Sequence, residues 1–132
     1  MKQINTLIVE DNAGSRQVIN IALKKVSDCQ INVIGEADSV DAANKIIEDS
    51  ASNPVQLVFL DYNLRGNKVG IELSRKYPSL AYIVISSESR IMEIINTEKQ
   101  NHTLHYMEHI TGGGVYTIKS IVDAVTKYLS VL

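Results

Sequence analysis

The chain has 132 residues, enough for one domain, and we expect a single domain without a linker. Charged residues make up 21% of the sequence, the net charge is −2, and no lysine and arginine cluster appears, so direct binding to nucleic acid is not expected. No apolar run approaches the ~18 residues of a membrane span, which predicts no membrane association. The only cysteine, Cys29, fits a reducing compartment, and we expect a cytoplasmic protein.

Five short apolar segments, each the length of one buried strand, alternate with segments whose apolar residues recur at helical spacing. This alternation predicts an α/β fold with a parallel sheet, because the connection between two parallel strands needs a crossover that a helix supplies. Strands are expected at 6–9, 31–34, 55–60, 81–85 and 103–107. Helices are expected from Ser15, from Ser39 as N-cap, over 69–77, over 90–99 and from Ile118.

Polar residues follow these strands at the points where they end. The third strand ends in Asp61, which should lie at the exposed end of the strand because burying a lone charge inside a sheet is costly. Glu10 and Asp11 follow the first strand. Ser86 follows the fourth strand, and His109 ends the fifth. Because ligands of such sheets bind at the carboxyl ends of the strands, we expect these side chains to meet at one edge.

This set of side chains suits phosphoryl chemistry. Three carboxylates placed close together repel one another unless a cation joins them. Carboxylate oxygens with room for water suit Mg²⁺, and a carboxylate beside that ion can attack a phosphoryl group to give an acyl phosphate. A hydroxyl such as that of Ser86 can donate a hydrogen bond to a phosphoryl oxygen, and a cation on the fifth strand can neutralise another.

Four stretches of the sequence carry a resemblance to a known family: residues 7–12, 35–43, 58–64 and 83–87. Over almost its whole length the chain resembles the receiver domains of two-component response regulators. The resemblance implies one receiver domain over residues 1–132. Its fold would be the flavodoxin-like α/β three-layer sandwich, with a five-stranded parallel sheet in the order 2-1-3-4-5 and five helices.

The resemblance also implies a role for individual residues. Asp61 would accept a phosphoryl group from a histidine kinase or a phosphotransfer protein. Glu10, Asp11 and Asp61 would hold Mg²⁺ (or Mn²⁺), together with the backbone carbonyl of Asn63. The chain would catalyse at most its own phosphorylation and slow dephosphorylation, so it would not be an enzyme in the ordinary sense.

Other matched positions concern the response to phosphorylation. Ser86 would move toward the phosphoryl group, and Tyr106 would be the switch aromatic residue. Asn63 and Glu88 match positions that tune the hydrolysis of the acyl phosphate. The partners implied are an output domain or an effector protein, with a homodimer as a further possibility.

The sequence departs from the family pattern at two positions. Arg65 stands where the family usually has proline, which changes the loop after Asp61. His109 stands where the family has lysine at the end of strand five. A histidine has a shorter reach than a lysine and an ordinary pKa of ~6.5, so it is a cation for part of the time only. A rival alignment uses Lys119 as the lysine, but it places strand five inside the last amphipathic segment.

These departures leave two alternatives to the phosphoryl-accepting receiver. One is a pseudo-receiver, a protein-interaction module that keeps the fold and has lost or weakened phosphorylation. The other is a magnesium-dependent hydrolase of small molecules, which is disfavoured because Asn63 occupies the position of a second catalytic aspartate.

Overall fold

The computed structural model describes residues 2–64, 70–86, 89–110 and 117–132. Strands and helices alternate along the chain, and all strands pair in parallel in the order β2-β1-β3-β4-β5. This arrangement confirms the α/β class and the strand order expected from the sequence. The elements are β1 (Gln3–Val9), α1 (Ala13–Leu23), β2 (Gln30–Ala37), α2 (Val40–Asp49), β3 (Leu57–Asp61), α3 (Glu72–Lys76), β4 (Ala81–Ile85), α4 (Ile91–Asn101), β5 (Tyr106–His109) and α5 (Ile118–Leu129).

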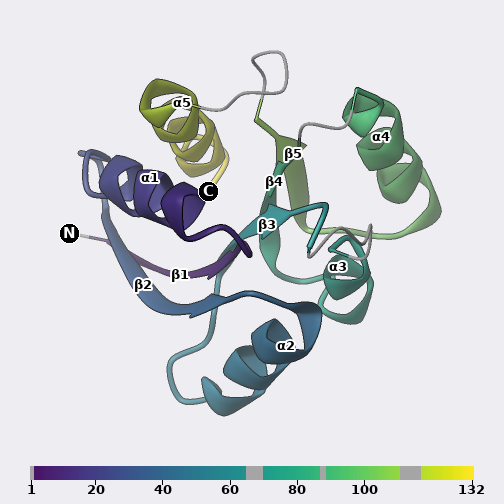
Figure 1. Cartoon of the computed structure of the whole chain (residues 1–132), viewed down its shortest axis with the longest axis horizontal. Helices are drawn as coiled ribbons and strands as arrows, with labels where there is room; N and C mark the ends of the chain where they lie inside the picture. Colours follow the sequence, from purple (N-terminus) through teal and green to yellow (C-terminus); the bar gives the residue numbers. More distant parts are fainter. Residues whose placement is uncertain (1, 65–69, 87–88, 111–116) are drawn as a thin grey trace.

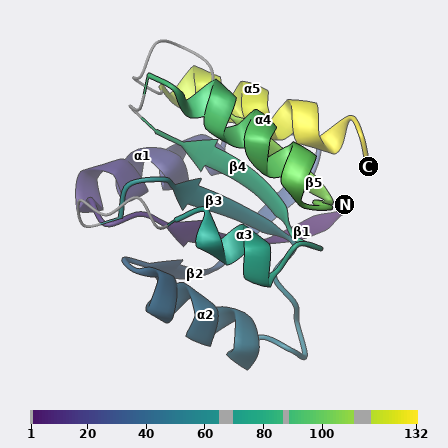
Figure 2. The same cartoon turned by 90° about the vertical axis from the view of Figure 1, so that its right-hand side faces the viewer.

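Helices cover both faces of the sheet, with α1 and α5 on one side and α2, α3 and α4 on the other (Figures 1 and 2). Because successive side chains of a strand point to opposite faces, each central strand contributes to two cores. In β3, Leu57 and Phe59 lie in the core under α1 and α5. Val58 and Leu60 lie in the core under α2, α3 and α4. The continuous apolar run before Asp61 therefore reflects a strand that is buried on both faces.

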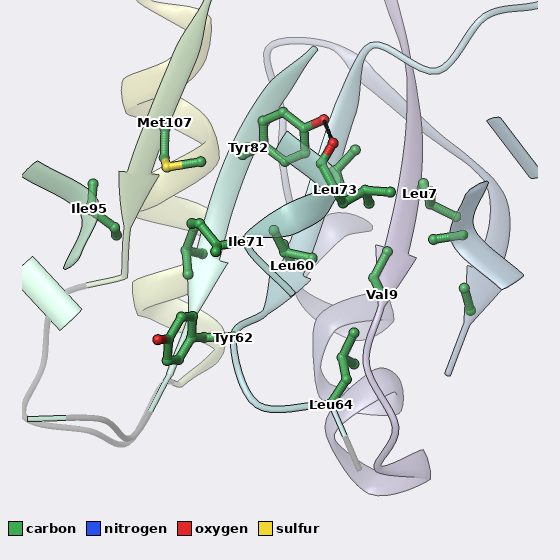
Figure 3. Packing of buried hydrophobic residues seen from close by; sticks show 14 of the residues in the cluster. Leu7, Val9, Leu60, Tyr62, Leu64, Ile71, Leu73, Tyr82, Ile95 and Met107 are labelled. Atoms are coloured by element: carbon green, nitrogen blue, oxygen red, sulfur yellow. Dashed lines mark hydrogen bonds between the residues drawn. The ribbon is translucent and has the colours of Figure 1, made fainter. Parts of the chain in front are cut away.

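The second of these cores also fixes α3 to the sheet (Figure 3). Tyr82 of β4 is fully buried, and its hydroxyl donates hydrogen bonds to the carbonyl oxygens of Tyr77 at 2.7 Å and Leu73 at 3.3 Å. Leu73 is the second residue of α3, and Tyr77 directly follows the helix. The bonds satisfy a buried hydroxyl and tie this short helix to the first half of β4, where Tyr82 pairs with Val58 of β3.

Several boundaries differ from those expected. β2 is longer than 31–34 because it pairs with β1 along its whole length, across a register shift between Thr6 and Leu7. α3 is shorter than 69–77, and Gly70 precedes it in a turn. β5 begins at Tyr106 rather than at 103, since pairing with β4 starts there. The N-cap at Ser39 is confirmed, as its side chain accepts a hydrogen bond from the Ala42 N–H.

Among the described residues, none of the helices combines the length and the apolar character needed to cross a membrane. The structure also decides between the two alignments of strand five. Lys119 lies in the first turn of α5, so β5 ends at His109, as the preferred alignment expected. Arg65 and Glu88, which the sequence comparison singled out, lie outside the described residues.

Candidate functional site

Three carboxylates meet at the carboxyl edge of the sheet. Glu10 follows β1 directly, Asp61 is the last residue of β3, and these two strands are neighbours. One carboxylate oxygen from each of Glu10, Asp11 and Asp61 lies within 4.8 Å of the other two. Glu10 is buried, Asp61 is half-buried and Asp11 is exposed, so the cluster opens to solvent on one side. We call Glu10, Asp11 and Asp61 the acidic cluster.

Glu10 is held through both its backbone and its side chain. Its N–H donates to the carbonyl oxygen of Ala37 at 2.9 Å, which continues the pairing of β1 with β2. Its Oε1 accepts a hydrogen bond from the N–H of Asn12 at 3.2 Å. Its carbonyl oxygen accepts one from Nη1 of Arg16 at 2.8 Å. Burial, followed by the nearby charge of Asp61, raises the pKa of Glu10 to about 8.

Asp61 is fixed at the end of β3. Its Oδ1 accepts a hydrogen bond from the N–H of Asn63 at 3.0 Å, and the N–H of Tyr62 donates to the Ile85 carbonyl oxygen at 3.0 Å. Burial raises the pKa of Asp61 to about 6, although the Asn63 N–H lowers it in part. Gly70 packs against the Asp61 carbonyl, where an added Cβ would lie 2.2 Å from the oxygen. The Asp61 carboxylate is thus half-buried and held in place at the end of β3.

The donor set of the acidic cluster fits a divalent cation. The oxygens are hard ligands within 4.8 Å of one another, and burial, followed by the neighbouring carboxylates, disfavours the charged forms of Glu10 and Asp61, as their raised pKa values indicate. Mg²⁺ and Mn²⁺ suit oxygen ligands, and an exposed side leaves room for the waters that Mg²⁺ retains. The arrangement can therefore bind such an ion and an anionic group beside it.

The remaining candidate residues lie around this edge. Ser86 follows β4, whose last residue, Ile85, pairs with Asp61. His109 ends β5 opposite Val84, so it lies two strands from β3, roughly 10 Å across the sheet at the usual strand spacing. Among the described residues Lys119 offers no substitute near this edge, since its side chain is 86% exposed and bonds Asp123 within α5.

Tyr106 is placed away from the acidic cluster, at the start of β5. Its ring contacts that of Tyr128 in α5, with centroids 5.0 Å apart and a tilt of 59°. Its hydroxyl is buried and has no hydrogen-bond partner among the described residues. A buried hydroxyl without a hydrogen-bond partner is unfavourable. A rotation of the Tyr106 ring toward solvent would remove this cost, because water could then bond the hydroxyl.

Solved structures of similar fold are response regulator domains. The chain aligns with the signal receiver domain of NarL from Mycobacterium tuberculosis at a TM-score of 0.70 and 23% identity, covering 98% of both chains. It aligns with the response regulatory domain of mrkE from Klebsiella pneumoniae at 0.71 and 18%, covering 97% of both. The phosphorylated cyanobacterial phytochrome response regulator RcpA gives 0.74 and 16%, covering 98% of this chain and 96% of that one.

The chain has the receiver fold. No family model and no curated protein matches the sequence, so this assignment depends on the three-dimensional likeness. In the receiver fold described here, the acidic cluster occupies the carboxyl edge of the two central strands β1 and β3.

Two residues that support the acidic cluster were not singled out as site residues from the sequence. Arg16 was expected only to lie outside the apolar face of α1, and its hydrogen bond to Glu10 depends on the path of the chain after β1. Gly70 was expected only as part of a loop, and its contact with Asp61 depends on a turn that returns to β3. The presence of a glycine in the loop after Asp61 was the one available signal for this contact.

Proposed function

We propose that this chain is a receiver that accepts a phosphoryl group on Asp61. The main support for the proposal is the acidic cluster at the carboxyl edge of a receiver fold. In this cluster one carboxylate oxygen from each of Glu10, Asp11 and Asp61 lies within 4.8 Å of the other two. These three side chains, with the backbone carbonyl of Asn63, would hold Mg²⁺ or Mn²⁺. The ion, when bound, would offset the charge of the incoming phosphoryl group.

In this reaction the main role of the protein is to place the reacting groups and to stabilise their charge. An Asp61 oxygen attacks phosphorus, a new O–P bond forms, and the bond from phosphorus to the leaving group breaks as that group departs with the electron pair. The Asn63 N–H, 3.0 Å from Asp61 Oδ1, orients the attacking carboxylate. Glu10 and Asp11, which follow β1, would hold the metal ion next to Asp61. Ser86 and His109 would bind oxygens of the transferred group from the ends of β4 and β5.

The expected response is a shift between two conformations, biased by the phosphoryl group. Ser86 would move toward that group. Tyr106, whose hydroxyl has no hydrogen-bond partner within the described part of the chain, would change its position with it. The donor would be a histidine kinase or a phosphotransfer protein in the cytoplasm. An output domain or effector protein would read the change, which involves β4, α4, β5 and α5.

The test is phosphorylation with a small donor. The protein is incubated with acetyl phosphate and Mg²⁺, and intact mass spectrometry counts phosphoryl adducts. We expect one adduct in the wild type and none in Asp61→Asn, whose amide is a poor nucleophile of nearly the same shape. Asp123→Asn, an exposed carboxylate on α5, serves as the matched control and should be modified like the wild type. Absence of any adduct over a range of donor and Mg²⁺ concentrations would exclude the proposal.

The second candidate function is a pseudo-receiver that binds a partner without regulated phosphorylation. The observation that favours it is the end of β5, where His109 stands and where Lys119 cannot take its place because it belongs to α5. The same experiment separates the two functions. A wild type that binds Mg²⁺ yet stays unmodified would support the pseudo-receiver.

A further inference from the structure

Arg16 connects three elements at the edge of the acidic cluster. It lies in the second turn of α1, a helix that begins after Asn12, whose side chain accepts a hydrogen bond from the Ser15 N–H at 2.9 Å. From there the Arg16 side chain, 26% exposed, reaches back to the end of β1. Its Nη1 donates to the Glu10 carbonyl oxygen at 2.8 Å. The Arg16 guanidinium therefore holds the backbone of Glu10, whose carboxylate belongs to the acidic cluster.

The other side of the guanidinium is held by β2. Nε of Arg16 lies 3.6 Å from Oε1 of Glu36, a residue of the strand next to β1. The amide of Asn20 donates both to that same Glu36 oxygen at 3.3 Å and to the Arg16 carbonyl oxygen at 3.0 Å. The Arg16 side chain therefore contacts Glu36 of β2 and the backbone of Glu10, and Asn20 of α1 holds the same Glu36 oxygen (Figure 1 shows α1 beside these strands).

We infer that Arg16 is a positioning residue, which holds Glu10 in the orientation that joins it to Asp11 and Asp61 around a divalent cation. The bond to the Glu10 carbonyl fixes the peptide that leads into Asp11. It thereby keeps Glu10 Oε1 at the Asn12 N–H, 3.2 Å away, and turns the carboxylate toward Asp61. The inference depends on the metal-binding part of the proposed function, because it states what Arg16 does for that site.

If Arg16 positions Glu10, replacing Arg16 should weaken Mg²⁺ binding. If Arg16 acts only through its charge, replacing it should strengthen Mg²⁺ binding. A positive charge near a cation site repels the cation, so deleting that charge alone would tighten Mg²⁺ binding. Losing a group that orients a metal ligand weakens binding, commonly by 10–100-fold. The sign of the change in Kd therefore identifies the role of Arg16.

The experiment compares the wild type with Arg16→Gln and with Lys24→Gln, which removes the same charge from an exposed position at the end of α1. Isothermal titration with MgCl₂ gives the Kd of each protein, and Tm without metal checks the fold. We expect roughly a tenfold higher Kd for Arg16→Gln and no change for Lys24→Gln. An unchanged or lower Kd for Arg16→Gln would overturn the inference.

A second readout needs no metal. Amide hydrogen exchange by NMR reports the Asn12 N–H, which bonds the Glu10 carboxylate. If Arg16 orients Glu10, this amide exchanges faster in Arg16→Gln than in the wild type, and at the wild-type rate in Lys24→Gln. Equal rates in all three proteins would overturn the inference on their own. A wild type that binds no Mg²⁺ would instead refute the proposed metal site, so the two failures are distinguishable.

Discussion

Gly70 lies directly against the backbone carbonyl of Asp61. A Cβ atom at position 70 would be 2.2 Å from the Asp61 carbonyl oxygen and 3.2 Å from the Tyr62 Cα. The Gly70 N–H also donates to the Tyr62 carbonyl oxygen at 3.3 Å. The turn before α3 is thereby held to the end of β3, and the backbone that carries the Asp61 carboxylate is constrained.

Gly70→Ala should therefore disturb both stability and the site. The added methyl group cannot share space with a backbone carbonyl, so the turn before α3 must move away from β3, at a cost of about 1–3 kcal/mol. Urea unfolding measures this loss, and the phosphorylation assay should show a slower reaction. Gly14→Ala is the control, because its Cβ would meet only the Asn12 side chain, at 3.2 Å. Equal stability of the two variants would contradict the contact.

Glu10→Gln should stabilise the metal-free protein at neutral and alkaline pH. The pKa of Glu10 is raised from 4.5 to about 8 in the folded state, so the folded protein binds more protons than the unfolded chain between these pH values. The free energy of unfolding of the wild type therefore falls as pH rises through this range. Glutamine does not titrate, so the variant should gain on the order of 1–3 kcal/mol at pH 8 relative to pH 5.

The measurement is the difference in unfolding free energy between wild type and Glu10→Gln, followed over pH with a chelator present. Glu93→Gln is the control, because this exposed carboxylate lies on α4 away from the acidic cluster. A difference that stays constant from pH 5 to pH 8 would show that Glu10 is not the titrating group.

An ion pair between a buried carboxylate and a half-exposed guanidinium connects α4 to α3. Glu98 of α4 is 7% exposed in its side chain, and both of its oxygens accept hydrogen bonds from Nε of Arg75 in α3, at 3.1 and 3.3 Å. Arg75→Met keeps the apolar stem and, among the described residues, leaves the buried carboxylate with His102 as its ion-pair partner, at 3.6 Å. We expect a loss of about 2–4 kcal/mol in unfolding free energy.

Arg90→Met provides the comparison for this pair. Arg90 bonds Glu93 within the start of α4, where both side chains are largely exposed, and such surface pairs contribute at most about 1 kcal/mol. Chemical denaturation of the two variants should therefore rank them clearly. If Arg75→Met lost no more stability than Arg90→Met, the Arg75–Glu98 ion pair would contribute no more to stability than an exposed pair.

His109→Lys should make phosphorylation faster or the phosphorylated form longer lived. A lysine is a permanent cation with a longer reach, and an added donor to a developing charge can change a rate tenfold or more. Time courses with acetyl phosphate measure both effects. The control is His105→Lys, an exposed position just before β5, at the other end of that strand. Identical kinetics for wild type and His109→Lys would show that His109 does not occupy the lysine position.

The sequence was sufficient for features that depend on local pattern. An apolar run that ends in Asp61 predicts a buried strand with a polar end, and the alternation of strands and helices predicts the parallel sheet. Contacts between distant segments could not be predicted in this way. Glu98 looks like a surface residue of a helix, and its contact with Arg75 of α3 cannot be derived from the pattern of α4 alone. Gly70 meets a carbonyl nine residues earlier, and Arg16 turns back to Glu10.

If Asp61 accepts the phosphoryl group, the modification must lie on that residue, and locating it is the decisive experiment. After incubation with acetyl phosphate and Mg²⁺, borohydride reduces an aspartyl phosphate to homoserine, and tandem mass spectrometry of the peptides gives its position. We predict homoserine at position 61 alone, and none when Mg²⁺ is removed by a chelator. Homoserine at position 11 or another aspartate, with Asp61 unmodified, would contradict it.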